Sequence, residues 1–397
     1  MTLKDNSDHY DIIVVGAGAI GSAFALAAAR RLDVKILVLE QAAQIIENRW
    51  PNQKVFALGK QATDMLDSIE MLEQLGSDNC YPYESMFVWD EQSAGDLFFD
   101  AKDIHVDRLG YMVDAINLTQ MMQQALEKSS QITTRYGVSL KHLDLEPRGE
   151  SNVSVRTAER EFKASLVVGA DGVNSWCREQ AKIFAHRRSY GQKGIVTRVQ
   201  TQDWHQETAW QVFLEGGPLA LLPLQDNQCS IVWSVPDNMA DDLLALSNAQ
   251  FGRAVCEALK GELGVVEVLS PRQVFPLQSL KADCYFKRGL ALIGDSAHAI
   301  HPLAGQGANL GFKDIVELVK ALSRYGQSKY GDLATLQSYQ RLRKSDNDQT
   351  DLMMSVLNEI YQLDSNRFAE LRGRGMNLIN KSSRLKRFLA RQAMGLI

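Results

Sequence analysis

The chain has 397 residues, of which 45% are hydrophobic and 23% charged, and its formal net charge is −5. These values are ordinary for a folded globular protein and give no reason to expect a nucleic-acid partner. The five cysteines are scattered and include no CxxC pair, which argues against a disulfide framework or a thiolate metal site. The N-terminal residues are polar and mixed in charge, so we expect no signal peptide and a cytoplasmic protein.

The chain begins with the pattern of a nucleotide-binding βαβ unit. Residues 11–15 (DIIVV) continue after Asp11 as an apolar, β-branched run, as in a buried parallel strand, and 22–32 are alanine-rich, as in a helix. A second strand over 34–39 ends at Glu40. The uncharged run 12–29 approaches the length of a membrane-spanning helix. Its β-branched first half and its three spaced glycines indicate instead a strand that turns into a helix.

The turn of this unit fits G-x-G-x-x-G, with Gly16, Gly18 and Gly21 at the glycine positions. The first glycine permits the tight turn, the second lets the backbone approach a pyrophosphate, and the third lets helix and strand pack closely. Glu40 would bind adenosine ribose hydroxyls and repel a 2′-phosphate, which excludes NADP here but leaves FAD and NAD open. The other residues that we assign to this cofactor site are Ala19, Ile20 and Gln41.

The rest of the chain alternates sheet and helix patterns. The expected elements are helices within 54–75 and 113–126, a β-meander over 131–161, a core strand at 165–168, a mostly antiparallel sheet over 190–235, a helix at 241–260, a return to the first domain from 274, helices at 311–325 and 333–343, and a helical remainder. Of the aromatic and aliphatic residues in the expected sheet, most should be core and a few should line a cavity; they are Trp210, Phe213, Leu221, Leu222 and Trp233.

Two further motifs follow strand ends. Gly169-Ala170-Asp171-Gly172 follows one core strand, and Gly294-Asp295 follows the apolar run 290–293. A carboxylate in such a place can hold a ribityl or ribose hydroxyl. The glycine-rich segment Gly305–Gly311 then opens a helix, whose bare N–H groups and dipole favour an anionic group. An NAD dehydrogenase needs neither motif, so the combination favours a flavin and an oxidoreductase.

In this order, GAGAIG, GADGVNSWCRE and GDSAHAIHPLAGQGANLGFKD resemble the motifs of the group A flavoprotein aromatic hydroxylases, and more narrowly those of ubiquinone biosynthesis. The stretches CSIVWS, RQVFPL and RQAMGLI are most similar to the branch that hydroxylates C5 of 2-octaprenylphenol. The resemblance implies an α/β fold of the p-hydroxybenzoate hydroxylase type: a Rossmann-like FAD-binding domain, an inserted antiparallel-sheet substrate domain (an α+β lobe) and a helical C-terminus. The expected division is 1–75, 100–180 and 275–345 for FAD, 76–99 and 181–274 for substrate, and 346–397 for a basic helical segment.

The resemblance also implies the chemistry. NAD(P)H, as a transient reductant, would reduce FAD, and O2 would hydroxylate a polyprenylated phenol through a flavin C4a-hydroperoxide. Asp171 and Arg178 belong to a motif associated with FAD and pyridine-nucleotide contacts, and Asp295 to the ribityl and pyrophosphate region. Pro302 would shape the oxygen pocket, and His301 is a pocket-wall or catalytic candidate. The remaining residues implied at the cofactor are Gly294, Gly305, Gln306, Gly307, Ala308 and Asn309.

Several alternatives stay open from the residues alone. His298 and His301 could suggest a metal or acid–base pair, but no ligand set completes it; we expect a structural role for His298 and no metal. Lys54 stands where the family usually has arginine, and lysine lacks the planar fork of arginine. The halogenase signature W-x-W-x-I-P is absent. A prenyl-chain reductase on the same fold and a non-catalytic lipid-binding subunit are the two rival functions.

The C-terminal segment carries a separate signal. Residues 367–397 contain eight basic residues and one acidic residue, Glu370, together with an apolar side at helical spacing. A basic amphipathic helix can lie on an anionic membrane surface, here the inner face of the membrane, or can bind a ubiquinone-biosynthesis complex. A solvated face of a docked helix explains the pattern equally well.

Overall fold

The first βαβ unit has the predicted form in the computed structural model, which describes residues 8–45, 54–146, 153–300, 306–362 and 366–394. Strand β1 (Asp8–Val15) leads through the glycine turn into helix α1 (Ala19–Arg31), and β2 (Ile36–Leu39) pairs with β1 in parallel. The uncharged run 12–29 is therefore a buried strand followed by a buried helix, as its glycines indicated. No helix in the described ranges is both long and apolar enough to cross a bilayer.

An eight-stranded sheet carries this unit. Its order is β18-β19-β11-β1-β2-β8, and β10 and β9 extend from β11. The remaining strands are β8 (Ile132–Arg135), β9 (Leu140–Asp144), β10 (Val153–Thr157), β11 (Glu161–Gly169), β18 (Phe286–Lys287) and β19 (Leu290–Leu292). Strands β19, β11, β1, β2 and β8 run in parallel, so their carboxyl ends share one edge of the sheet.

The second large sheet has nine strands, in the order β20-β17-β12-β15-β14-β13-β5-β6, with β16 beside β12. Its strands are β5 (Ser85–Asp90), β6 (Asp96–Asp100), β12 (Ala185–Thr201), β13 (Thr208–Leu214), β14 (Gly217–Pro223), β15 (Gln228–Pro236), β16 (Val266–Val268), β17 (Gln273–Ala282) and β20 (His298–Ala299). Only β13 and β5 pair in parallel among these described strands, which confirms the predicted antiparallel sheet.

A small antiparallel sheet lies between the two large ones. It has the order β3-β7-β4, with β3 (Val55–Gly59), β4 (Cys80–Tyr83) and β7 (Gly110–Asp114). The amphipathic helix expected within 54–75 therefore occupies only α2 (Lys60–Ser68), and a strand precedes it.

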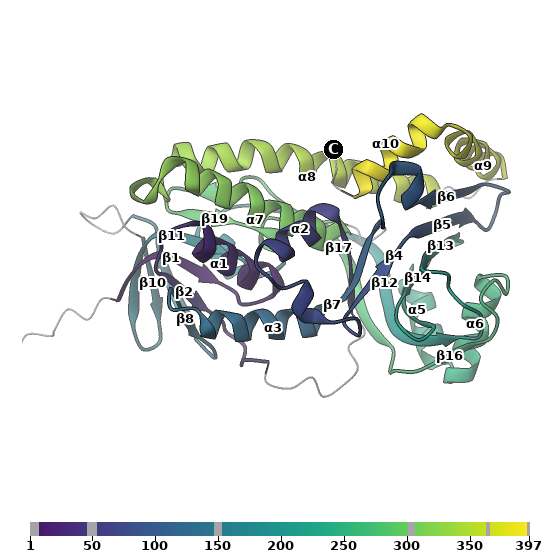
Figure 1. Ribbon diagram of the computed structural model, residues 1–397, viewed down its shortest axis with the longest axis horizontal. Coiled ribbons are helices and arrows are strands. Elements are labelled where there is room, and N and C mark those ends of the chain that lie inside the picture. The colour runs from purple at the N-terminus through teal and green to yellow at the C-terminus, as the bar shows by residue number, and fades with distance from the viewer. Residues whose placement is uncertain (1–7, 46–53, 147–152, 301–305, 363–365, 395–397) are drawn as a thin grey trace, which may run out of the picture.

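The helices cover the sheets and form the C-terminus (Figure 1). They are α3 (Ala115–Lys128), α4 (Trp176–Gln180), α5 (Asp237–Ala245), α6 (Asn248–Ala258), α7 (Gln306–Tyr325), α8 (Leu333–Gln362), α9 (Asn366–Lys381) and α10 (Ser383–Ala393). The single helix predicted at 241–260 is two helices. Ser247 caps α6 by accepting from the Gln250 N–H, and the Gln250 side chain accepts from the Ser247 N–H, which starts a new helix there.

Successive side chains along the strands of the nine-stranded sheet point to opposite faces, so an apolar cluster forms on each face. We call the face that packs against α5 and α6 the rear face, and the face toward α8 the front face. Trp210, Leu221 and Trp233 pack on the rear face with α5 and α6, whereas Phe213 packs on the front face. Helix α8 runs along one edge of the molecule, and α9 and α10 lie over the outer strands β5 and β6 (Figure 1). The front face is thus enclosed between the sheet, the loops of the first domain and the C-terminal helices.

Candidate functional site

Three loops that follow adjacent parallel strands meet at one edge of the eight-stranded sheet. They follow β1, β11 and β19. A Cβ atom built on Gly16 would lie 2.5 Å from the Ala170 carbonyl oxygen, and one on Gly311 would lie 2.8 Å from the Ile20 side chain. The Arg178 guanidinium donates to the Ser296 carbonyl oxygen at 2.7 Å. The three motifs are therefore in contact, at the position where doubly wound sheets bind nucleotides.

The glycines of the first loop meet the requirements of their pattern. Gly16 has φ +104°, a backbone conformation that residues other than glycine rarely adopt. A Cβ on Gly21 would clash with the Gly16 carbonyl oxygen, whereas one on Gly18 would meet no atom within 4 Å. Gly21 is thus needed by the fold. Gly18, at the N-terminus of α1, leaves open space where a phosphate could approach the bare N–H groups.

Gly18 and Gly21 should respond differently to replacement by alanine. Gly18→Ala is expected to cost less than about 1 kcal/mol of folding stability, because it changes only a helix cap, but to weaken FAD binding about tenfold or more. Gly21→Ala should cost about 1–3 kcal/mol even without FAD, since it overpacks the turn. Urea unfolding of the FAD-free variants and titration with FAD measure the two effects. Unchanged FAD affinity in Gly18→Ala would contradict this account of the loop.

The Glu40 side chain is hydrogen-bonded to the first loop. Its carboxylate accepts hydrogen bonds from the Ala17 N–H at 2.6 Å and the Ala42 N–H at 2.8 Å. The carboxylate thereby stays beside the glycine turn, where a ribose would lie. Gln41 is exposed, and Ala19 is half-buried at the start of α1.

The second loop is held mainly by its own side chains. The Asp171 carboxylate accepts from the Ser175 hydroxyl at 2.6 Å and from the Cys177 N–H at 2.9 Å. Burial raises the pKa of Asp171, although these hydrogen bonds oppose the rise. Arg178 is buried and donates to the carbonyl oxygens of Ser296 and Val173. Asp171 thus holds its own loop together, and Arg178 joins this loop to the third one.

The third loop presents one exposed carboxylate. Gly294 has φ +60° and lies against Ile20, so the turn fits closely on α1. Asp295 is exposed although its neighbours Gly294 and Ser296 are buried. The Ser296 hydroxyl donates to the Gly169 carbonyl oxygen at 2.7 Å. Asp295 is therefore the acidic side chain of this loop that is free to accept hydrogen bonds from a hydroxylated ligand.

A buried ionic network supports the third loop from behind. Asp314 on α7 accepts from the Gly294 N–H at 2.9 Å, lies 2.6 Å from His298 Nε2, and accepts from Arg343 Nε at 2.8 Å. All three side chains are at most 5% exposed. Burial alone would raise the pKa of Asp314, but His298 and Arg343 outweigh it and the pKa is lowered. The network keeps the Asp314 carboxylate ionised in the core. His298 takes part in it and so has a structural role.

The N-terminus of α7 completes the site. Asn309 Oδ1 accepts from the Gly59 N–H at 2.9 Å, and its Nδ2 donates to the Ala57 carbonyl oxygen, which fixes the first turn against β3. A Cβ on Gly307 would meet nothing within 4 Å, and its neighbours Gln306 and Ala308 are half-buried. The predicted residues His301, Pro302 and Gly305 lie outside the described residues.

These features fit a dinucleotide that carries an isoalloxazine ring. Open space lies at Gly18 and Gly307, at the N-termini of α1 and α7, where helix dipoles favour negative charge. The carboxylates of Asp295 in the third loop and Glu40 at the first loop are of the kind that accepts hydrogen bonds from ligand hydroxyl groups. Among the described residues, no group of three or more His, Cys, Asp or Glu side chains could hold a metal ion.

Sequence reasoning missed Asp314 and Arg343, the centre of the supporting network. Asp314 stands in the last position of the GANLGFKD string, but no role was assigned to it. The available signal was its spacing. Leu310, Gly311, Ile315 and Leu318 share its helix face and are all buried, so a charge at 314 needs a buried partner.

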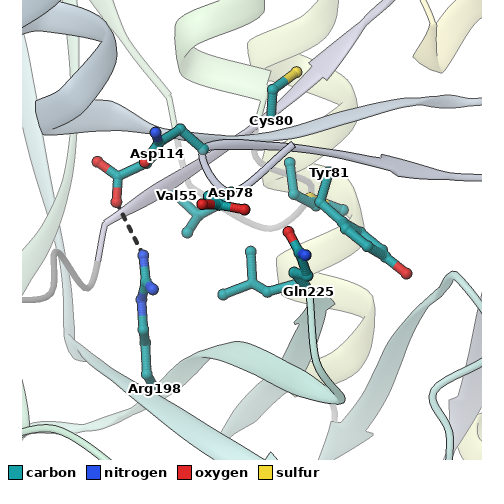
Figure 2. Close-up of a pocket in the computed structure, with 10 residues that line it drawn as sticks. Val55, Asp78, Cys80, Tyr81, Asp114, Arg198 and Gln225 are labelled. Atoms are coloured by element: carbon teal, nitrogen blue, oxygen red, sulfur yellow. Dashed lines mark hydrogen bonds and ion pairs between the residues drawn. The ribbon is translucent and has the colours of Figure 1, made fainter. Parts of the chain in front are cut away.

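A separate small pocket lies between the three-stranded sheet and the nine-stranded sheet (Figure 2). Arg198 Nη2 pairs with Asp114 Oδ2 at 2.9 Å across it, and Asp78, Tyr81 and Gln225 line its rim. The space holds about one water molecule. The pocket is therefore a polar junction between the two sheets and too small for a substrate ring.

The comparisons with known proteins agree with this site. Residues 9–350 match the family model described as an FAD binding domain. The 3-demethoxyubiquinol 3-hydroxylase of Escherichia coli is 33% identical over 398 residues, covering 97% of this chain and 98% of the relative. The ubiquinone hydroxylase UbiL of Rhodospirillum rubrum is 31% identical over 392 residues, covering 97% and 89%.

The solved structures show the same fold. The p-nitrophenol 4-monooxygenase PnpA of Pseudomonas putida superposes with a TM-score of 0.78 at 15% identity, covering 98% of each chain. PqsL of P. aeruginosa in complex with 2-aminobenzoylacetate has a TM-score of 0.76 at 22% identity, covering 91% of this chain and 99% of PqsL.

The fold and the three-loop site define a flavin-dependent α/β oxidoreductase with an added antiparallel sheet. The chain belongs to the FAD binding domain family, and its cofactor is FAD. It is an FAD-dependent aromatic-ring monooxygenase.

Proposed function

We propose that this protein hydroxylates the aromatic ring of a polyprenylated phenol in ubiquinone biosynthesis. The observation that carries the proposal is the contact of three nucleotide-binding loops at one sheet edge. Support for the substrate class comes from relatives matched over nearly the whole chain. They are named as a 3-demethoxyubiquinol 3-hydroxylase, a ubiquinone biosynthesis monooxygenase and a ubiquinone hydroxylase.

In this proposal FAD, when bound, supplies electron transfer from NAD(P)H and activation of O2. The chain itself binds and orients the cofactor and the phenol, and it excludes water from them. Gly18 and the start of α1 would hold the pyrophosphate, Glu40 the adenosine ribose, and Asp295 the ribityl chain. The first turn of α7 would stabilise negative charge on the flavin ring. The roles proposed for Pro302 and His301 concern residues outside the described part of the chain.

The proposed division of labour follows the sheets. The segments 1–75, 100–180 and 275–345 would bind FAD, and 76–99 with 181–274 would bind the substrate. The support is that β1, β2, β8, β11 and β19 share the eight-stranded sheet, whereas β5 and β12–β16 share the nine-stranded sheet. Strands β17 and β20 of the segment 275–345 also join the nine-stranded sheet, so the segments do not coincide fully with the sheets. The segment 346–397 would act as a separate basic helical element.

For the ring position we propose C5 of 2-octaprenylphenol, on the three sequence stretches that resemble this branch. The relative from E. coli is named for 3-demethoxyubiquinol, which makes hydroxylation of that ring the second candidate. The two differ in the substrate consumed. Mass spectrometry of the quinone intermediate that accumulates in cells without this protein distinguishes them.

The activity itself is tested with purified protein, FAD, NADH or NADPH, and a prenylated phenol. In isotopically labelled O2 the product should gain a single labelled oxygen atom on the ring, and without O2 no product should form. Saturation of a chain double bond in the absence of O2 would instead establish the rival prenyl reductase. Binding of the phenol without any turnover would favour the non-catalytic subunit.

We also propose that the protein rests on the inner face of the membrane through α9 and α10. Five large apolar side chains on these two helices are exposed: Phe368, Leu371, Leu378, Leu385 and Phe388. The exposed basic residues beside them are Arg374, Lys381, Arg384, Arg387 and Arg391. Apolar side chains can enter the headgroup region while basic ones contact anionic lipids.

Flotation with vesicles that contain phosphatidylglycerol tests this proposal. The double variant Leu385→Glu and Phe388→Glu should lower the recovered fraction several-fold, and added salt should lower recovery of the unaltered protein. Leu333→Glu is the matched control, because Leu333 is 54% exposed at the far end of α8. Equal recovery of all three proteins would reject the membrane role.

A further inference from the structure

A methionine-rich cluster lies between the front of the nine-stranded sheet and the C-terminal helices. Its buried members are Val88, Phe213, Ile300, Leu310, Met354 and Met376, and its half-buried members are Met86, Leu97, Met353, Leu357 and Tyr361. Four of the 12 methionines of the chain are thus gathered among eleven side chains. We call this set the methionine-rich cluster.

The inner end of the methionine-rich cluster adjoins the proposed flavin ring. Leu310 directly follows Gly305–Asn309, the residues that the family resemblance implies at the isoalloxazine, and Ile300 precedes the same motif. Val88 and Phe213 stand on the front face of the sheet. A phenol placed between this face and the flavin would therefore have the cluster as an immediate apolar neighbour.

The outer end of the cluster reaches the protein surface along α8. Met354 is 5% exposed, Met353 is half-buried, and Leu352 is 65% exposed. Leu352, Val356 and Ile360 follow at intervals of four residues and form an exposed apolar stripe on the outer face of α8. The half-buried Met353 and Leu357 lie between this stripe and the buried Met354, so apolar side chains continue from the cluster to the exposed face of α8.

One wall of the methionine-rich cluster is fixed. The Tyr361 ring stacks on Phe213 with centroids 3.6 Å apart and an interplanar angle of 7°, and its hydroxyl donates to Met376 Sδ at 3.3 Å. The buried Arg372 pairs with Asp90 at 3.0 Å and its guanidinium lies 5.3 Å from the Tyr361 ring centroid. Helix α9 is therefore anchored on the sheet, and Tyr361 fixes the C-terminal end of α8 there as well. The preceding turns of α8 contribute Met353, Met354 and Leu357 to the cluster.

We infer that the methionine-rich cluster binds the first isoprene units of the substrate's polyprenyl chain and leads the chain out along α8. This inference rests on the proposed function. A polyprenyl chain offers only apolar surface with methyl branches, so its site needs adaptable apolar contacts. Methionine, unbranched and with three rotatable bonds, supplies these, and it specifies a static core poorly. Its concentration beside the ring site fits a ligand surface better than a permanent core.

Chain-length selectivity tests the inference. Met353→Trp and Met354→Trp fill the proposed path, and Met239→Trp is the matched control because Met239 is a half-buried methionine on the rear face of the sheet. The substrates are phenols that carry a single isoprene unit or a chain of several units. The path variants should lower kcat/KM for the long-chain phenol about tenfold or more, and for the short-chain phenol less than about twofold.

The unaltered protein provides a second measurement, in case a tryptophan variant does not fold. Its kcat/KM should rise as isoprene units are added and then level off. A flat dependence on chain length, or equal losses for both phenols in the path variants with FAD content retained, would overturn the inference and leave the hydroxylase activity standing. If the unaltered protein hydroxylates neither phenol, the proposed function itself fails, and the inference fails with it.

Discussion

Replacing Arg343 with methionine should lower the free energy of unfolding by about 3–5 kcal/mol. The guanidinium is 5% exposed and is held by Asp314, Asp346 and Asn347. Removing it leaves the Asp314 carboxylate buried without its arginine partner, with hydrogen bonds from the Gly294 N–H and His298 remaining. An uncompensated buried charge is costly, because the protein interior solvates it far less well than water does.

Arg341→Met provides the control for this experiment. Arg341 is exposed and lies two residues before Arg343 on the same helix, so its loss should change stability by about 0.5 kcal/mol or less. Urea unfolding of the FAD-free proteins compares the two variants. If both were as stable as the unaltered chain, the network would not support the third loop in the way described.

The second large effect is expected at Asp295. Asp295→Ala should raise the dissociation constant of FAD by about 10- to 100-fold, since hydrogen bonds to a charged group contribute about 1.5–3 kcal/mol each. Because Asp295 is exposed and its neighbours do not depend on it, the FAD-free variant should unfold at the same urea concentration as the unaltered protein.

A control variant accompanies the Asp295 experiment. Asp242→Ala removes an exposed carboxylate from α5 and should leave FAD affinity unchanged. Fluorescence titration with FAD gives the dissociation constants. A variant without Asp295 that retained FAD through purification as fully as the Asp242 variant would show that the third loop does not bind the cofactor through this carboxylate.

The parts of the fold that the sequence predicted well are those encoded by neighbouring residues. The strand, the glycine turn and helix α1 follow from an apolar run and three glycines, and the steric surroundings of Gly16 and Gly21 explain why those positions need glycine. The break between α5 and α6 was also encoded locally, by Ser247 and Gln250 in a capping box, but the longer helical pattern obscured it.

The parts that the sequence did not predict depend on partners distant in the chain. Arg343 meets Asp314 across two packed helices, 29 residues apart, and Arg372 meets Asp90 across 282 residues. The same limit applies to the sheet residues. Period-two alternation puts Trp210 and Phe213 on opposite faces, but only the position of α5, α6 and α8 shows which face adjoins the site.

The identity of the retained prosthetic group tests the central claim most directly. Protein purified under mild conditions, or after incubation with FAD, should release FAD in stoichiometric amount when it is denatured, as measured by absorbance and mass. Release of a nicotinamide dinucleotide in its place, or no retention of added FAD, would contradict a site built from three converging loops for a flavin.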